Sequence, residues 1–396
     1  MAGIATGGRL SPPLAPLEAL VGRYDPSALE LPDGKGRIRL EVTGHDEFDV
    51  LLSRGRASLR PASSAHPDAL LSADRATWGK VAKDVRAGMT AFRRGRLSVR
   101  RNLHLGVGFL AATSGSAEPG RLEFSSLNTE MGTLAMATAG TGEPLVCLPG
   151  LGATKASFLP TISDLAGDDL RLIALDLPGF GDSVKPIGAP YDAKYFARAT
   201  VAALDALGLD RAHLAGNSMG GRVAIETAFQ HPDRVNRLVL LSPALAWLRH
   251  RPWAPFLRLV RPELGLLQPA PRPVVGQIVR RLVPGAMDGW AAAGVDEFLR
   301  AYYDPRGRAA FYAAARNIYL DEPGGDKGFW KRLSALEAES LFVWGRQDKL
   351  VPIAFKRHVA EALPAARHLE LDCGHVPQVE APRETHRAAR KFLLAG

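Results

Sequence analysis

The chain has 396 residues, more than one ordinary domain needs and enough for two. Apolar residues make up 46% and charged residues 23% of it, the composition of a globular protein, and no stretch approaches the roughly 20 uncharged apolar residues of a membrane-spanning helix. The net charge of +9 comes without a nucleic-acid-binding motif, which favours an arginine-rich solvated surface and argues against a nucleic-acid partner.

The first residues, 1–24, are rich in Gly and Pro and have neither a basic start nor an apolar run, so we expect a loose lead and not a secretory leader. A cytoplasmic location is expected on that basis. The two cysteines, Cys147 and Cys373, each have an apolar or glycine neighbour, which favours buried free thiols over a disulfide. Neither belongs to a cluster with the spacing of zinc ligands, and the sequence predicts no metal or other cofactor.

Residues 25–111 predict a small α+β domain. Short strand-like runs come first, and residues 37–43 alternate charged and apolar side chains as a half-buried strand does. We expect a helix over 73–86 and a short helical turn over 89–93. Residues 97–105 indicate a further strand because their apolar positions are two apart. The strands are expected to form an antiparallel sheet.

A run of small and polar residues, ATSGSAEPG, indicates a linker, which we place at 112–126. Downstream, short apolar runs alternate with helical stretches over 127–244 and 336–396. This pattern predicts a mostly parallel sheet with flanking helices. The stretch between them, 245–335, is rich in Arg, Pro and aromatic residues and has no clear strand. We expect it to form a helical lid over the edge of the sheet.

The strongest chemical signal is the segment GNSMGG at 216–221, which follows an apolar strand-like run and precedes a helical one. A Gly-x-Ser-x-Gly segment at a strand-to-helix turn projects its serine at the carboxyl end of the sheet. The positive end of the following helix favours an anion at the same place. Ser218 is therefore the predicted nucleophile.

A serine hydroxyl attacks efficiently only when a base takes its proton. The predicted base is His375, in DCGHVP near the C-terminus, and the predicted orienting acid is Asp348, in WGRQDKLVP just past a buried strand. The reaction also needs two backbone donors for the developing oxyanion. Met219 N–H follows the nucleophile directly, and we expect Leu151, in the turn PGLG, to supply the other donor.

With these segments in place, residues 127–396 resemble the α/β-hydrolase fold superfamily over their whole length. The resemblance rests on PGLG, DLPGFGDS, GNSMGG, WGRQDKLVP and DCGHVPQVEAP. The order Ser218, Asp348, His375 is the chain order of that superfamily. One departure is Pro149, because the family commonly has His before the glycines of the oxyanion turn. A serine nucleophile sets the chain apart from dehalogenases and epoxide hydrolases of this fold, which carry Asp.

The N-terminal domain resembles the sterol-carrier-protein-2 family through the order of its elements over 68–110. Domains of that family enclose an apolar tunnel for acyl chains or sterols, so the resemblance implies a lipid-binding role. The alternative is a structural or dimerising addition to the hydrolase.

In the predicted lid, Trp247, Trp253 and Phe256 are candidates for the wall of an acyl pocket, although such residues more often pack a lid on its core. Between 244 and 290 the chain has seven Arg and two acidic residues. A basic surface of this kind suits a transient contact with an anionic membrane, and equally a solvated face.

These features together predict a serine hydrolase that cleaves carboxylic esters or thioesters of lipid-like or other apolar acyl substrates through an acyl-enzyme. Two alternatives stay open. GNSMGG also resembles the meta-cleavage carbon–carbon bond hydrolases, but those usually have Trp directly after the catalytic His, where this chain has Val376. The other alternative is a lipid-binding or transfer protein with an inactive hydrolase domain.

Overall fold

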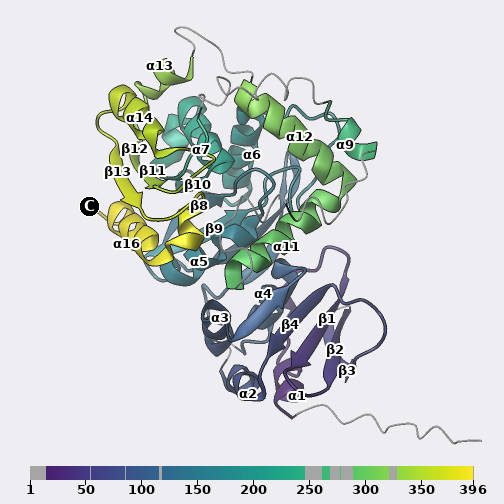
Figure 1. Cartoon of the computed structure of the whole chain (residues 1–396). Coiled ribbons are helices and arrows are strands. Elements are labelled where there is room, and N and C mark those ends of the chain that lie inside the picture. The colour runs from purple at the N-terminus through teal and green to yellow at the C-terminus, as the bar shows by residue number, and fades with distance from the viewer. Residues whose placement is uncertain are drawn as a thin grey trace, which may run out of the picture. The chain divides into compact units, whose positions relative to one another are not determined.

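The computed structural model describes residues 15–53, 55–84, 86–115, 118–245, 261–267, 277, 289–320 and 328–395. The chain divides into two compact units, Met1–Ser116 and Ala117–Gly396, and each is described by itself (Figure 1). None of the helices in the described ranges combines the length and the apolar character needed to cross a bilayer.

The N-terminal unit contains a five-stranded sheet in the order β3-β2-β1-β4-β5. Its strands are β1 (Lys35–Val42), β2 (Glu47–Ser53), β3 (Arg56–Pro61), β4 (Ala69–Ala73) and β5 (Leu97–Arg100). The expected antiparallel sheet is wrong at one pair, because β1 and β4 are parallel. The cause is the connection 62–68, which brings the chain back to the start of β1, where Asp68 N donates to Arg37 O. The strand β4 therefore leaves in the direction of β1.

The helices of this unit are α1 (Ala15–Val21), α2 (Arg75–Lys83), α3 (Arg86–Arg93) and α4 (Leu103–Ala112). Two expectations differ from the structure. Part of the predicted loose lead is the helix α1, which buries Leu17 and Leu20. The predicted strand over 97–105 ends at Arg100, because the Asn102 side chain accepts a hydrogen bond from Leu105 N and caps α4. The apolar residues of α4 are buried all round, as expected for a helix without a polar face.

The C-terminal unit contains an eight-stranded sheet in the order β13-β12-β11-β10-β8-β9-β7-β6. Its strands are β6 (Glu123–Thr129), β7 (Gly132–Ala139), β8 (Glu143–Leu148), β9 (Leu170–Leu175), β10 (Ala212–Asn217), β11 (Val235–Leu241), β12 (Glu339–Gly345) and β13 (Arg367–Leu371). All pairs are parallel except β6 with β7 and β7 with β9. The expected mostly parallel sheet with flanking helices is therefore confirmed.

The predicted linker, 112–126, is longer than the connection in the structure. Ala112 ends α4, and Glu123 already begins β6. The edge strand β6 buries only Phe124 and Leu127. Its apolar alternation is therefore too weak to mark it as a strand in the sequence.

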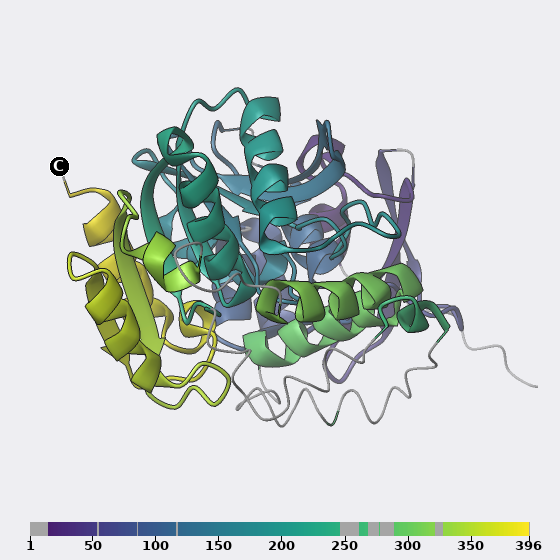
Figure 2. The same cartoon turned by 90° about the horizontal axis from the view of Figure 1, so that it is seen from above.

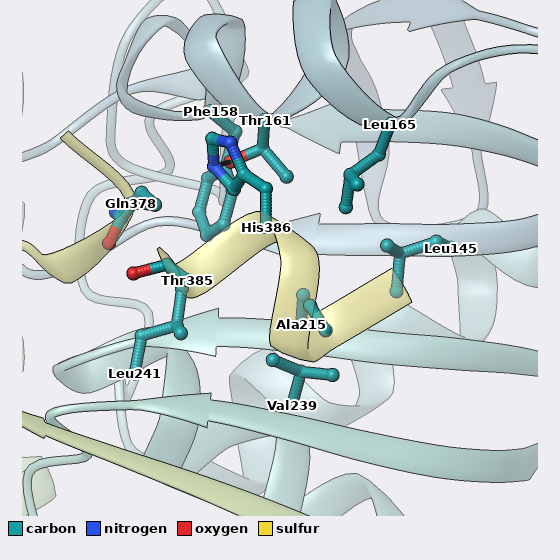
Figure 3. Close-up of a pocket in the computed structure, with 11 residues that line it drawn as sticks. Leu145, Phe158, Thr161, Leu165, Ala215, Val239, Leu241, Gln378, Thr385 and His386 are labelled. Atoms are coloured by element: carbon teal, nitrogen blue, oxygen red, sulfur yellow. Dashed lines mark hydrogen bonds between the residues drawn. The ribbon is translucent and has the colours of Figure 1, made fainter. Parts of the chain in front are cut away.

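Helices cover both faces of this sheet, namely α5 (Leu159–Leu165), α6 (Ala193–Ala206), α7 (Met219–Gln230), α14 (Lys356–Ala362) and α16 (Pro382–Leu393). Successive residues of a strand point to opposite faces. Leu214 and Leu238 belong to the large core shared with α6 and α7. Their neighbours Ala215 and Val239 instead line a small cavity together with α5 and α16 (Figure 3). The helices α6 and α7 thus lie on one face, and α5 and α16 on the other.

Within 245–335, the described residues form helices and no strand: α9 (Leu264–Leu267), α11 (Gly289–Tyr303), α12 (Pro305–Leu320) and α13 (Phe329–Leu333). The two long helices α11 and α12 lie side by side in both views (Figures 1 and 2). The short helix α9 packs against α12.

Candidate active site

Ser218 occupies the sharp turn between β10 and α7. Its backbone has φ 53° and ψ −116°, a combination that side-chain-bearing residues seldom adopt. The turn is held by a hydrogen bond of 3.0 Å from Ser218 N to Leu241 O. Two glycines make it sterically feasible. A Cβ at Gly216 would collide with Gly220 O, and a Cβ at Gly220 would collide with Leu148 O.

The two predicted oxyanion donors lie on either side of this turn. Met219 is the first residue of α7, where a main-chain N–H has no acceptor within the helix. Leu151 belongs to the turn that comes after β8. This turn lies directly against Ser218, because a Cβ at Gly150 would be 3.3 Å from Ser218 Cβ. An oxyanion formed at Ser218 would therefore meet the amino end of α7 and the 149–152 turn.

Asp348 and His375 form a pair, with 2.8 Å between His375 Nδ1 and Asp348 Oδ2. The Asp348 side chain is completely buried, and that of His375 is 15% exposed. The other oxygen of Asp348 accepts hydrogen bonds of 2.8 Å from the amides of Leu350 and Val351. Both carboxylate oxygens are thus in use, and Nε2 is the ring nitrogen left for proton exchange.

The loops that carry the pair come after β12 and β13, so the pair lies at the sheet edge where β10 delivers Ser218. Close approach of these loops depends on Gly345, where a Cβ would collide with Gly374 O. Asn217 connects the loops further. Its Nδ2 donates to Leu241 O at 3.0 Å and to His375 O at 3.1 Å. Sequence reasoning missed Asn217, because the Gly-x-Ser-x-Gly pattern leaves this position unspecified.

The predicted pocket residues Trp247, Trp253 and Phe256 lie outside the described residues. The structure instead brings two aromatic residues of α11 and α12 to the oxyanion turn. A Cβ at Gly152 would be 2.6 Å from the Phe298 ring and 3.0 Å from the Phe311 ring. The two rings meet edge to face at 5.9 Å between their centroids. Aromatic residues at helical spacing were visible in the sequence, but they more often indicate core packing.

A buried ion pair lies just beyond the oxyanion turn. Lys155 Nζ is 2.6 Å from Asp176 Oδ2 and 3.0 Å from Asp182 Oδ2. The side chains of Lys155 and Asp176 are completely buried. Burial opposes the charge on Lys155, but the two carboxylates outweigh it and raise the pKa of the ammonium group. The segment DLPGFGDS carries both aspartates, and sequence reasoning gave neither of them this partner.

The ion pairs of Lys155 with Asp176 and Asp182 also contact the helix α11. Arg300 lies 3.0 Å from Asp182 and 2.6 Å from Glu297. Thr154 Oγ1 donates to Glu297 Oε1 at 3.3 Å, which closes a ring of contacts back to Lys155. The ring connects α11 to the segment that carries the oxyanion turn.

The cavity in Figure 3 is not a substrate site. Its volume of about 10 Å³ holds about one water molecule. It lies on the face covered by α5 and α16, beside His386, which pairs with Asp164 at 2.7 Å and with Thr161 Oγ1 at 3.1 Å. Over the described ranges, no group of three or more His, Cys, Asp or Glu side chains is arranged to hold a metal ion.

Two protein families match the chain. Residues 143–273 match the α/β hydrolase fold family, and residues 22–110 match the SCP-2 sterol transfer family. A 2-hydroxy-6-oxononadienedioate/2-hydroxy-6-oxononatrienedioate hydrolase of Burkholderia vietnamiensis is 32% identical over 263 residues, which are 64% of this chain and 88% of the relative. The chain belongs to the α/β-hydrolase family. Both resemblances drawn from the sequence are confirmed.

Two solved structures are also similar to this chain. A hydrolase from Pseudomonas aeruginosa PA01 is 27% identical with a TM-score of 0.57, covering 69% of this chain and 98% of its own. A membrane phospholipase A described as a bacterial virulence factor is 28% identical with a TM-score of 0.55, covering 69% and 86% respectively.

Proposed function

We propose that this chain is a serine hydrolase that cleaves carboxylic esters or thioesters of apolar acyl groups. The observation that carries the proposal is the 2.8 Å contact between His375 Nδ1 and the buried Asp348 Oδ2, at the sheet edge where Ser218 lies on its strained turn. A carboxylate in this position holds one imidazole tautomer and stabilises the protonated ring. Those are the properties a base needs in order to activate a serine hydroxyl.

In the proposed reaction, His375 Nε2 takes the proton of Ser218 Oγ as the oxygen attacks the acyl carbonyl carbon. The Met219 and Leu151 amides stabilise the oxyanion of the tetrahedral intermediate. The imidazolium then gives its proton to the departing oxygen or sulfur, which leaves an ester on Ser218. Water, deprotonated by His375, attacks that ester, and the carboxylic acid leaves as Ser218 regains its proton.

Three features support an apolar acyl substrate. The rings of Phe298 and Phe311 lie against Gly152 of the oxyanion turn, where an acyl chain would leave the reacting carbon. Residues 22–110 belong to a sterol-transfer type of domain. A similar solved structure is that of a membrane phospholipase A. We infer that the N-terminal unit binds lipid-like molecules with acyl chains or sterol-like groups.

Carbon–carbon bond hydrolysis of a vinylogous diketone is the second candidate. It is favoured by the 32% identity with the hydrolase from Burkholderia vietnamiensis, whose name gives a 2-hydroxy-6-oxo-dienedioate as substrate. The residue after His375 speaks against it, because Val376 stands where Trp is usual in the meta-cleavage enzymes.

The first test is labelling with a fluorophosphonate probe, followed by a chain-length series of p-nitrophenyl esters and thioesters. We expect labelling at Ser218, its loss in Ser218→Ala, and the highest kcat/KM on medium or long acyl chains. A parallel assay on a ring-fission dienoate separates the second candidate. No labelling, together with lipid that co-purifies with the chain, would instead identify a lipid-binding protein with an inactive hydrolase domain.

A further inference from the structure

Side chains bind three main-chain polar groups of the segment 374–376, which has His375 at its centre. Glu380 Oε2 accepts a hydrogen bond of 2.7 Å from Gly374 N, and Glu380 Oε1 accepts one of 2.9 Å from Val376 N. The carbonyl oxygen of His375 between them accepts from Asn217 Nδ2 at 3.1 Å. One carboxylate therefore spans the residue whose imidazole serves as the proposed base.

This contact is more than the cap of a short helix. The helix α15 (Pro377–Glu380) begins after Val376, and a glutamate of its first turn that caps it needs to bind only the Val376 amide. The second oxygen of Glu380 goes instead to the opposite side of His375. Gly374 permits this approach, because a Cβ there would be 2.6 Å from Glu380 Oε2. Hydrogen bonds to an ionised carboxylate are roughly twice as strong as neutral ones. The two hydrogen bonds to Glu380 therefore hold the main chain on both sides of His375 firmly.

We propose that Glu380 is a positioning residue for His375, an inference that rests on the proposed function. Asp348 fixes one ring nitrogen, Nδ1. That single contact does not fix the main chain from which the side chain extends. The direction of Nε2 then depends on the main chain of His375, which Glu380 holds from both sides. A misplacement of about 1 Å at a reacting group can lower a rate about 100-fold.

The test uses Glu380→Gln, which keeps the size of the side chain but has one acceptor oxygen. Its oxygen can keep one of the two amide partners, and its NH₂ group then faces the other amide, which is also a donor. We expect the second-order rate constant of fluorophosphonate labelling to fall about 10- to 100-fold. For ester hydrolysis, kcat should fall by a similar factor while KM changes little. The matched control is Glu384→Gln, at an exposed glutamate of α16, which should label at the wild-type rate.

A double-mutant cycle separates positioning from a general effect on folding. In a His375→Ala background, Glu380→Gln should leave the slow residual labelling rate unchanged, because its effect acts through the imidazole. The labelling amplitude reports the folded fraction, and the rate constant reports the chemistry. Equal losses of rate in both backgrounds would overturn the inference.

Two further outcomes distinguish the inference from the proposed function. Wild-type labelling with an unchanged rate in Glu380→Gln overturns the positioning role alone. A wild-type chain that does not label at Ser218 overturns the proposed function and the positioning role with it.

Discussion

Lys155 and Asp176 form an ion pair at 2.6 Å in which both side chains are completely buried. Asp176 Oδ1 also accepts a hydrogen bond of 2.6 Å from the main-chain amide of Lys155. The pair therefore joins the segment after the oxyanion turn to the end of β9, beneath the helix α11 that contacts the same charged group. Removing one partner of a buried ion pair strongly lowers the stability of a fold, because it leaves an uncompensated charge in the interior.

Lys155→Met should destabilise the C-terminal unit by about 3–5 kcal/mol, because it leaves the completely buried Asp176 without its ammonium partner, whereas Asp182 keeps Arg300. Urea unfolding followed by circular dichroism measures this change. The control is Lys356→Met, at a lysine that is 37% exposed and paired with Glu370, where the loss should be below about 1 kcal/mol. Adding Asp176→Asn to Lys155→Met should recover part of the stability; a purely additive loss would contradict direct pairing.

Asp348→Asn should lower kcat about 10⁴-fold, because an amide turned towards Nδ1 cannot hold the tautomer that a base needs. The amides of Leu350 and Val351 can still bind the remaining oxygen, so the loop should keep its fold. Steady-state ester hydrolysis gives the rate, and thermal unfolding checks the fold. A nearby control is Asp372→Asn, whose side chain bonds Gln347 and not the histidine; a similar loss there would weaken the assignment.

Phe298→Ala should change the preference for acyl chain length. Removing the ring that lies against Gly152 opens space beside the oxyanion turn, and each methylene that gains or loses an apolar contact is worth about 1–3 kcal/mol. We expect the ratio of kcat/KM between long and short p-nitrophenyl esters to change at least about 10-fold. Leu267→Ala, at a side chain on α9 that is 82% exposed, should leave this ratio as it is.

The stability of the N-terminal unit should fall in acid because of Asp49, whose side chain is 1% exposed. Burial alone would raise its pKa, but hydrogen bonds from Arg39, from the Ser63 amide and from Arg37 outweigh burial and lower the pKa from 3.8 to about 2. A carboxyl group with a lowered pKa stabilises the fold above its unfolded pKa. That contribution, about 2 kcal/mol, is lost as the pH falls from about 4 to about 2.

Urea unfolding of the N-terminal unit across this pH range measures the loss. Asp49→Asn should be less stable than the wild type at neutral pH, because two arginines lose their carboxylate. Its stability should also change less between pH 4 and pH 2. Parallel pH profiles of the two proteins would rule out Asp49 as the source.

Local patterns sufficed for the residues that the structure brings to the sheet edge. Ser218, Asp348 and His375 each follow the carboxyl end of a strand, and the loops after parallel strands meet at one edge of a sheet. The hydrogen bonds that hold these residues in place could not be predicted from the sequence. Asn217 binds a main-chain oxygen of another loop, and Glu380 binds two main-chain amides of the residues just before it. The segments GNSMGG and DCGHVP do not specify either partner.

The wrong predictions for the N-terminal unit arose because local signals in the sequence favoured different structures. Leu103 and Leu105 fit the alternation of a strand, but the Asn102 cap and the apolar run behind it form α4. The parallel pairing of β1 with β4 results from the path of a loop, which sequence periodicity does not record. The proposed acyl-pocket residues were also difficult to predict, because Phe298 and Phe311 lie on different helices and meet only through the packing of α11 on α12.

The backbone of Ser218, at φ 53° and ψ −116°, lowers the stability of the fold at the same residue that the proposed activity requires. Conformations this rare cost about 1–3 kcal/mol, which the rest of the fold must offset. Glycine adopts positive φ without that penalty, so Ser218→Gly should melt at a higher temperature than the wild type while losing all reaction with the probe. Selection for thermal stability alone would replace Ser218, and only selection for the proposed turnover would retain it.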